Sequence, residues 1–342
     1  MRVLQGGAEE PSSTDDPRPK IGLVLGAGGV VGQAYQVGVL AALEREAHWD
    51  PRDSSLIVGT SAGSVTGAAI RMGVPASDLA ASTYGVPMSR AGGALLKQII
   101  PDDSPLPVPS ILSLLRPWNA PSLALIGRTI RRPLAFRPDV AAMTLLPRGR
   151  VDISARAHAL HDMVGDNWPG GLWICAARRT DGEWVVLGRD GSPSAPLASA
   201  VLASCAIPGY FTPITIDGVE YFDGGVHSST NADVLEAQHL DTVIVVSSMS
   251  AAGGLAPGPD AFLRWSVHRR LDREIARLEA RGTTVIRLEP GPESRHAMGL
   301  WAMAEHRAPR VVEAAYEETR SRVLSSPLLA ALGGSHPASA AG

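Results

Sequence analysis

The sequence contains only two cysteines, no long apolar run and no large excess of either charge. Cys175 and Cys205 both lie in apolar surroundings, which favours a reduced intracellular protein over a disulfide scaffold. No stretch approaches the roughly 18 to 20 apolar residues of a membrane-spanning helix. The first twenty residues are polar and predict neither a signal peptide nor a membrane anchor. We therefore expect a cytoplasmic protein and leave peripheral contact with the inner membrane surface open.

Charge and metal-ligand spacing exclude two further classes of protein. A net charge of -3 on 342 residues argues against general nucleic-acid binding. No His, Cys or carboxylate cluster has the spacing of a metal-ligand set, so we expect neither a metal nor another cofactor. The sequence leaves the oligomeric state open.

Composition predicts a single large domain between two tails. Residues 1–20 are rich in Glu, Asp, Ser, Pro and Gly, and we expect a disordered tail there. Residues 21–324 are expected to form one α/β domain, interrupted by an insert at about 88–168. Residues 325–342 are rich in Ala, Gly, Ser and Pro and predict a flexible C-terminal tail.

The domain opens with a strand, a turn, a helix and a second strand. Ile21 to Leu25 is a short apolar strand, and it leads into the glycine-rich turn Gly26 to Gly32. The segment from Gln33 to Ala47 has helical apolar spacing, and a second strand begins at Leu56. This order implies parallel strand pairing and an α/β fold.

The second strand ends in a candidate nucleophile. In Gly59-Thr60-Ser61-Ala62-Gly63, two glycines flank Ser61 at the spacing of a nucleophile elbow, where a sharp turn between strand and helix presents the hydroxyl. Glycine avoids a clash with the neighbouring backbone on both sides. Alone, the pattern also fits a serine that caps a helix after a tight turn.

The turn from Gly26 to Gly32 has three interpretations. A dinucleotide-binding turn needs a third glycine where Val31 stands and a carboxylate after the second strand, and both are missing. Alternatively, the amides of Gly28 and Gly29 hold an oxyanion. The third interpretation is a turn that only permits close helix packing.

An elbow serine needs a base, and a carboxylate is the best candidate. Of the nine histidines, His227 alone lies in a context that suggests a site. Ile214 to Phe222 predicts a hairpin around an Asp-Gly turn, and it leads directly into Asp223-Gly224-Gly225. The glycines let the chain turn tightly and bring the Asp223 carboxylate close to another backbone. Asp223 also fits an ordinary turn or capping residue.

Four motifs together resemble the patatin-like phospholipase family. They are the turn Gly26 to Gly32, the elbow Gly59 to Gly63, the segment Ala203 to Phe211 and the turn Asp223 to Gly225, in the order and approximate spacing of that family. The resemblance covers about Ile21 to Ser248, with a variable insert between.

The resemblance implies a three-layer α/β/α fold with a mostly parallel central sheet and a helical insert. It also implies a Ser-Asp dyad in which Ser61 is the nucleophile and Asp223 the general base, with Gly28 and Gly29 as the oxyanion hole. Gly59, Gly63 and Gly224 belong to the elbow and turn motifs. One departure stands out: Val31 occupies the position before Gly32 where the family usually has Arg or Lys.

The insert carries the features of a lipid-facing surface. Gly92 to Leu115 contains apolar groups that prolines separate, a pattern that fits a lid or a lipid-contacting segment. Arg116 to Arg156 carries eight arginines against two aspartates. The alternative is a helical insert that packs on the domain and exposes its arginines to water.

After the insert, the pattern again predicts an α/β domain. Strands are expected at Leu172 to Ala177, Glu183 to Leu187, Thr242 to Ser247 and Thr284 to Leu288, and helices at Leu197 to Cys205, Ala261 to Arg281 and Ala308 to Leu324. The helix from Ala261 places Phe262, Trp265, His268, Leu271, Ile275 and Leu278 on one stripe.

Together these features predict a serine esterase that hydrolyses carboxylic esters of lipids, phospholipid or acylglycerol, through an acyl-serine. Two alternatives remain: an acyltransferase that uses the same dyad, and a catalytically silent lipid-binding module.

Overall fold

The structure is a computed structural model that describes residues 19–99, 122–131, 138–153, 167–251, 258–330 and 332. The predicted N-terminal tail up to residue 18 lies outside the described residues. So do the insert segments 100–121, 132–137 and 154–166 and most of the C-terminal tail. Of that last tail, the structure describes a short helix, α12 (Pro327–Ala330), in which Leu329 is buried.

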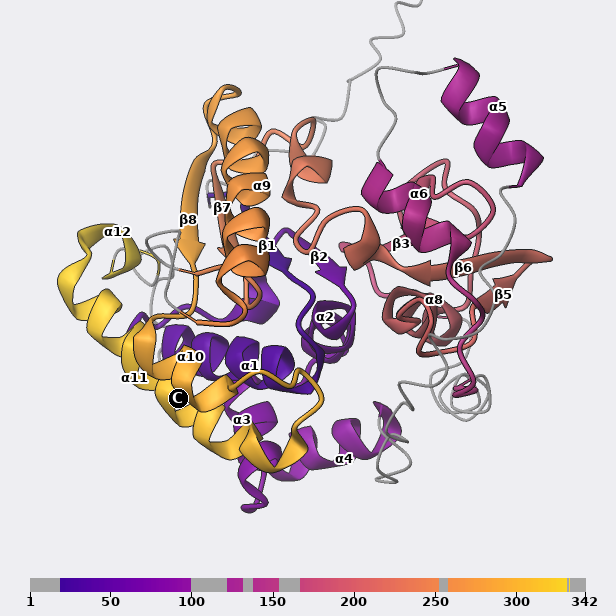
Figure 1. The fold of residues 1–342 in the computed structure, drawn as a ribbon. Helices are drawn as coiled ribbons and strands as arrows, with labels where there is room; N and C mark the ends of the chain where they lie inside the picture. Colours follow the sequence, from indigo (N-terminus) through magenta and orange to yellow (C-terminus); the bar gives the residue numbers. More distant parts are fainter. Residues whose placement is uncertain are drawn as a thin grey trace, which may run out of the picture.

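One mixed sheet forms the centre of the described chain (Figure 1). Five strands pair in parallel in the order β3-β2-β1-β7-β8. Two strands, β4 and β6, pair antiparallel with β3, and β5 pairs antiparallel with β6. The bounds are β1 (Ile21–Leu25), β2 (Leu56–Thr60), β3 (Leu172–Arg178), β4 (Trp184–Leu187), β5 (Ile214–Ile216), β6 (Val219–Asp223), β7 (Thr242–Val246) and β8 (Thr284–Leu288).

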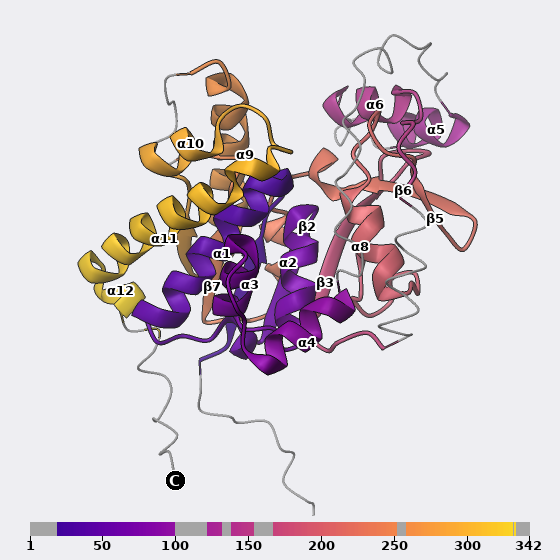
Figure 2. The same cartoon turned by 90° about the horizontal axis from the view of Figure 1, so that it is seen from below.

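Helices cover both faces of this sheet (Figure 2). The remaining described helices are α1 (Gly29–Glu46), α2 (Ala62–Arg71), α3 (Ala76–Tyr84), α4 (Arg90–Ile99), α5 (Leu123–Arg131), α6 (Pro138–Leu145), α8 (Leu197–Cys205), α9 (Ala261–Glu279), α10 (Pro292–Met298) and α11 (Ala308–Ser325). Short 3-10 helices occur at η1 (Pro51–Asp53), η4 (Gly224–Val226), η5 (Ala232–Leu235) and η6 (Glu305–Arg307).

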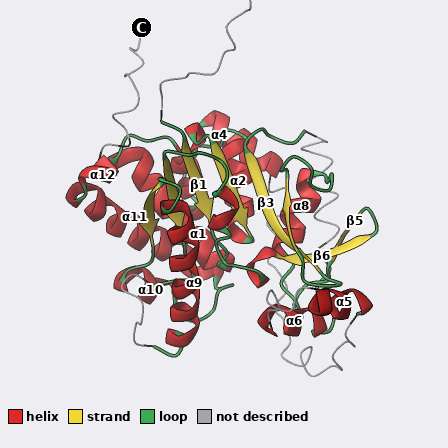
Figure 3. Cartoon of the chain, turned by 90° about the horizontal axis from the view of Figure 1, so that it is seen from above, coloured by secondary structure: helices red, strands yellow, loops and turns green. Residues whose placement is uncertain are grey.

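Alternation along the strands divides the core into two layers. Leu23 and Ile57 point into the cluster that packs against α1, α2 and α11, whereas Val24 and Val58 point into the cluster with α9. In Figure 3 the strands run between helices on either side. The predicted three-layer α/β/α class with a mostly parallel sheet is confirmed.

Most predicted elements lie within two residues of their predicted bounds, and α1 and α9 differ from their predictions in more instructive ways. β1, α8 and β8 match the predicted residues. Helix α1 begins at Gly29, four residues earlier than predicted, and Gly29 itself has a positive φ of 62°, a backbone conformation that glycine adopts easily. Helix α9 buries Leu271 and Leu278, but Phe262 and Trp265 of the same predicted stripe are exposed. Among the described residues, no helix has the length and apolar character to cross a bilayer.

Candidate active site

Ser61 stands on a strained turn between β2 and α2. Its φ of 54° and ψ of -121° lie in a region that non-glycine residues rarely adopt. The Ser61 amide donates to Oγ of Ser204 at 2.9 Å, and Ser204 Oγ in turn donates to the Cys175 carbonyl at 2.6 Å. The backbone of the turn is therefore fastened to α8 and β3, and the conformation is the one a nucleophile elbow requires.

The two glycines of the elbow are sterically necessary. A Cβ atom on Gly59 would lie 2.6 Å from the Gly63 carbonyl oxygen, and one on Gly63 would collide with the carbonyl of Leu25. The elbow therefore packs against the end of β1, with which β2 pairs in parallel. Because parallel strands end at the same edge of a sheet, the glycine-rich turn after β1 and Ser61 after β2 emerge side by side.

Strand β3 aligns the end of β2, which precedes Ser61, with the end of β6, which carries Asp223. Thr60 of β2 pairs with Cys175, and Asp223 of β6 pairs with Ala176, the next residue of β3. Strand β4 pairs with both Cys175 and Ala176 on their other side, so β2 and β6 share one edge of β3. β2 runs parallel to β3 and β6 antiparallel, so their carboxyl ends meet head to head.

The two side chains that this arrangement brings together interact. Ser61 and Asp223 are both buried, and hydrogen bonding from the Ser61 hydroxyl lowers the pKa of the Asp223 carboxylate. Asp223 Oδ1 also accepts from the Gly225 amide at 2.7 Å. Burial raises the pKa of Asp223 to about 6, although the two hydrogen bonds oppose the shift. A carboxylate with this pKa takes up and releases a proton near neutral pH.

The turn after Asp223 also depends on glycine. A Cβ atom on Gly224 would collide with the Cys175 carbonyl, and Gly225 lies against Ala27 of the glycine-rich turn. The Asp223 turn therefore contacts both β3 and the turn between β1 and α1.

Gly28 and Gly29 form the N-terminal end of α1, which is 18 residues long. Within the described part of the chain, their amides donate to no acceptor, whereas the Val31 amide donates to the Ala302 carbonyl at 3.1 Å. Free amides at a helix N-terminus attract negative charge. A side chain on Gly28 would collide with Ser248 Oγ, and one on Gly29 would lie 2.8 Å from the Ala302 oxygen.

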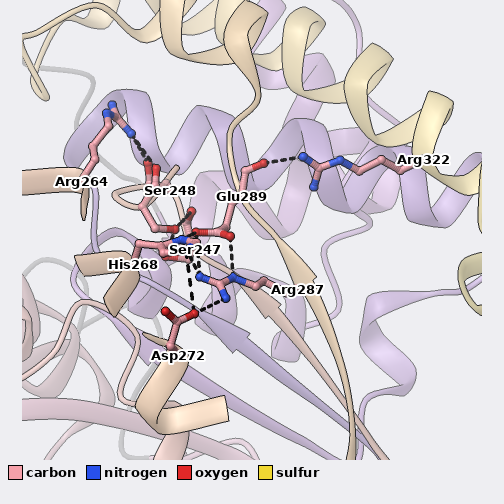
Figure 4. A network of polar contacts seen from close by, with 9 residues as sticks. Ser247, Ser248, Arg264, His268, Asp272, Arg287, Glu289 and Arg322 are labelled. Atoms are coloured by element: carbon pink, nitrogen blue, oxygen red, sulfur yellow. Dashed lines mark hydrogen bonds and ion pairs between the residues drawn. The ribbon is translucent and has the colours of Figure 1, made fainter. Parts of the chain in front are cut away.

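Val31, which replaces the basic residue usual in the family, points into the hydrophobic core. Arg264 is linked to the same turn through Ser248, and Figure 4 shows the contact between these two residues. Arg264 of α9 is buried and donates to the carbonyls of Ser248 and Ser250 at 3.1 and 3.0 Å. Ser248 Oγ then donates to the Ala27 carbonyl at 2.7 Å. Arg264 thus holds the segment that supports the glycine-rich turn.

Three polar residues of the site were missed by sequence reasoning: Ser204, Asn231 and Ser248. Asn231 is buried, has a positive φ of 53°, and donates to Thr60 Oγ1 at 3.0 Å and to the Ser228 carbonyl at 2.7 Å. It therefore connects the end of β2 to the loop that follows Asp223. The polar run Ser228-Ser229-Thr230-Asn231 between two strands was the available signal, because buried polar residues in such a run need partners.

His227, the one histidine in a suggestive context, follows η4 and stacks on Trp184 with ring centroids 5.1 Å apart. Among the described residues, no three His, Cys, Asp or Glu side chains gather so that they could hold a metal ion.

Comparison with known proteins shows the family of the chain. The model of the family described as patatin-like phospholipase matches residues 23–236, which include the elbow, the Asp223 turn and the glycine-rich turn. The chain belongs to the patatin-like phospholipase family, and this membership indicates a lipid hydrolase in general.

No curated protein matches the chain. Among solved structures, it is similar to VipD from Legionella pneumophila at 12% sequence identity. That match covers 90% of this chain and 67% of VipD, with a TM-score of 0.42.

Proposed function

We propose that the chain is a serine esterase that hydrolyses carboxylic ester bonds of lipids, phospholipid or acylglycerol, through a Ser61–Asp223 dyad. The placement of the Ser61 hydroxyl beside the buried Asp223 carboxylate, whose pKa it lowers, carries this proposal. Geometry supports it, because β2 and β6 meet on one edge of β3 and present these two side chains to each other. No metal or other cofactor takes part in the proposed reaction.

In the proposed mechanism, Asp223 takes the proton from Ser61 Oγ as this oxygen bonds to the acyl carbon. The carbonyl oxygen becomes negative and accepts hydrogen bonds from the amides of Gly28 and Gly29. The intermediate then expels the alcohol, which takes the proton from Asp223. Water attacks the acyl-serine, gives a proton to Asp223, and releases the fatty acid as the proton returns to Ser61.

The Asp223 pKa of about 6 supports the role of a base. At neutral pH most of the carboxylate is ionised, yet it is basic enough to share the serine proton in the transition state. The pKa is high because burial penalises the charged form, and Ser61 and Gly225 oppose this only with neutral donors.

The decisive experiment measures a panel of phospholipids, acylglycerols and p-nitrophenyl esters with wild type, Ser61→Ala and the matched control Ser77→Ala. Ser77 is exposed on α3, so its loss should leave turnover unchanged. We expect Ser61→Ala alone to lose both turnover and labelling by a fluorophosphonate. A wild-type protein that fails to label would favour a silent lipid-binding module. Acyl transfer to an added alcohol in preference to water would favour an acyltransferase.

A further inference from the structure

Exposed apolar side chains surround the end of the molecule that carries the candidate site. The first group lies on the first turns of α9, where Phe262, Leu263 and Trp265 are all exposed, Phe262 to 76%. The Phe262 and Trp265 rings lie 5.9 Å apart. Between them, Arg264 is buried and bound to the carbonyls of Ser248 and Ser250. The backbone under these rings is therefore fixed.

A second exposed pair lies on the loop between α10 and η6. Leu300 is 69% exposed and Trp301 about half exposed. The next residue, Ala302, accepts the Val31 amide and touches Gly29. Trp301 therefore directly precedes a residue, Ala302, that packs against Gly29 of the proposed oxyanion hole. We call Phe262, Leu263, Trp265, Leu300 and Trp301 the aromatic rim.

A third group lies on α5, on the Asp223 side of the site. Leu123, Ile126 and Ile130 have i, i+3, i+7 spacing and are exposed, Leu123 to 88%, while Leu125 on the opposite side of the helix is buried. We call these three residues the α5 stripe. The neighbouring helix α6 contacts η4, which follows Asp223. An apolar stripe on a helix normally faces the core, and this one faces outward.

The aromatic rim and the α5 stripe lie on the same side of the molecule. In Figures 2 and 3, which view it from below and above, α9, α10, α5 and α6 all line one edge. That edge is the one at which the parallel strands end and the candidate site lies. A flat surface in contact with both groups would face the end of the sheet that carries the candidate site.

Charge identifies the occupant of this surface. The segment from residue 116 to residue 156, which contains α5 and α6, carries eight arginines and two aspartates, and Arg131 at the end of α5 is exposed. Tryptophan and phenylalanine favour the boundary between water and hydrocarbon, and an exposed arginine at the end of a helix with an apolar stripe, as Arg131 is, favours anionic lipid head groups.

We propose that the aromatic rim and the α5 stripe dock the protein on an anionic lipid surface, with the site facing the lipid. This inference rests on the proposed lipid esterase function, because only an aggregated lipid substrate makes such docking useful. The sequence predicted that the insert contacts lipid. Among the described residues of the insert, the proposal assigns this contact to α5, and it adds the aromatic rim, which lies outside the insert.

The test measures cosedimentation with phosphatidylcholine vesicles that contain none or one third phosphatidylglycerol. Leu300→Ser/Trp301→Ser and Ile126→Ser/Ile130→Ser are compared with wild type. The matched control is Leu324→Ser/Leu328→Ser, which also changes two exposed leucines, Leu324 being 75% exposed, but at the far end of α11 and in α12. We expect each site-side double variant to lose about tenfold or more in binding to anionic vesicles and the control to lose less than twofold.

Charge dependence is tested with Arg128→Gln/Arg131→Gln/Arg132→Gln and with added salt. We expect wild-type binding to favour the anionic vesicles and to weaken as salt screens the surface charges over about 8 to 10 Å. The triple variant should lose most of this preference. Equal binding of wild type to both vesicles would contradict the charge argument.

Activity separates this proposal from the esterase proposal. Hydrolysis of p-nitrophenyl butyrate should stay within twofold of wild type in all these variants, while vesicle phospholipid hydrolysis falls with binding. If the chain has no esterase activity, the binding pattern still tests the surface, with Ser61→Ala as a second background. Unchanged vesicle binding in both site-side variants would overturn the proposal. So would a dimer that these variants convert to monomer, because the surface would then join two copies.

Discussion

Two buried carboxylates at the same edge of the sheet have opposite environments. Asp223 is contacted by neutral donors, the Ser61 hydroxyl and the Gly225 amide. Glu289, after β8, forms an ion pair with Arg287 at 2.5 Å, lies 2.9 Å from His268 Nδ1, and its backbone carbonyl accepts from Arg322 (Figure 4). Arg287 also pairs with Asp272 at 2.6 Å.

The difference separates a carboxylate whose pKa is suited to proton exchange near neutral pH from one that holds structure. Within the described residues no ion pair involves Asp223, so its charge is stabilised only by dipoles, and burial raises its pKa to about 6. Glu289 is bound to a guanidinium and fastens β8 to α9 and α11. Four predictions test this contrast, in order of decreasing effect.

The largest expected effect is on catalysis. Asp223→Asn and Ser61→Ala should each lower kcat/KM for a soluble ester by about 10⁴-fold or more, because each removes a partner of the same proton transfer. The double variant should be no slower than the worse single variant. A double variant slower by the product of both losses would contradict a dyad. Circular dichroism of all three proteins checks that the fold is retained.

Removing the cation beside Glu289 should affect stability instead. Arg287→Met leaves a buried carboxylate without its guanidinium, and we expect a loss of about 3 to 5 kcal/mol in the free energy of unfolding, toward the lower value because Arg287 is partly exposed. The matched control is Arg281→Met, which breaks the exposed pair with Glu236 and should cost less than about 1 kcal/mol. Urea unfolding measures both. At temperatures where Arg287→Met is folded, its kcat/KM should equal that of wild type.

The opposite change in stability is expected for Asp223→Asn. The folded pKa of Asp223 is about 6 and the reference value 3.8, so the folded state binds the proton more tightly. The free energy of unfolding of wild type therefore falls as pH rises from about 4 to 6, because Asp223 must ionise in the folded state. Above pH 6 the loss stays at its full value of about 2 to 3 kcal/mol. Asp223→Asn should be more stable than wild type by this amount at pH 8. The gain should vanish at pH 4, and a loss of stability at pH 8 would contradict an unpaired buried charge.

The smallest expected effect is the pH dependence of the wild type. Only the ionised Asp223 accepts the serine proton, so kcat/KM should be constant above about pH 7 and fall tenfold per unit below the pKa of about 6. A soluble ester without titrating groups is the right substrate, because lipid surfaces change charge with pH. A midpoint near 4 would mean that Asp223 is solvated when the substrate binds.

Local signals in the sequence predicted the parts of the site that depend on backbone turns. Gly59 and Gly63 mark the elbow because no side chain fits there, and the pattern is visible within five residues. The Asp-Gly turn before β6 is equally local, with Asp217 and Gly218 both at positive φ. Such positions limit the residue type directly, so the sequence records them.

The contacts that connect the turns were not predictable in this way. Ser204 lies 143 positions from Ser61, and Asn231 lies 171 positions from Thr60. Their roles follow from strand pairing, which no local pattern specifies. The prediction that one apolar stripe of α9 is buried was wrong in part, for a related reason. Helical spacing predicts that residues share a face, but only the packed structure shows that Leu271 is covered and Phe262 is exposed.

The meeting of β2 and β6 on one edge of β3 has a consequence for biosynthesis. Ser61 and Asp223 are separated by 223 - 61 = 162 residues, and β3, which aligns them, is made between the two. At about 5 to 20 residues per second, the ribosome needs roughly 8 to 30 seconds to add that length. Throughout this interval the nascent chain contains the proposed nucleophile but not the proposed base. An esterase with this proposed dyad would therefore be inactive until Asp223 has been synthesised.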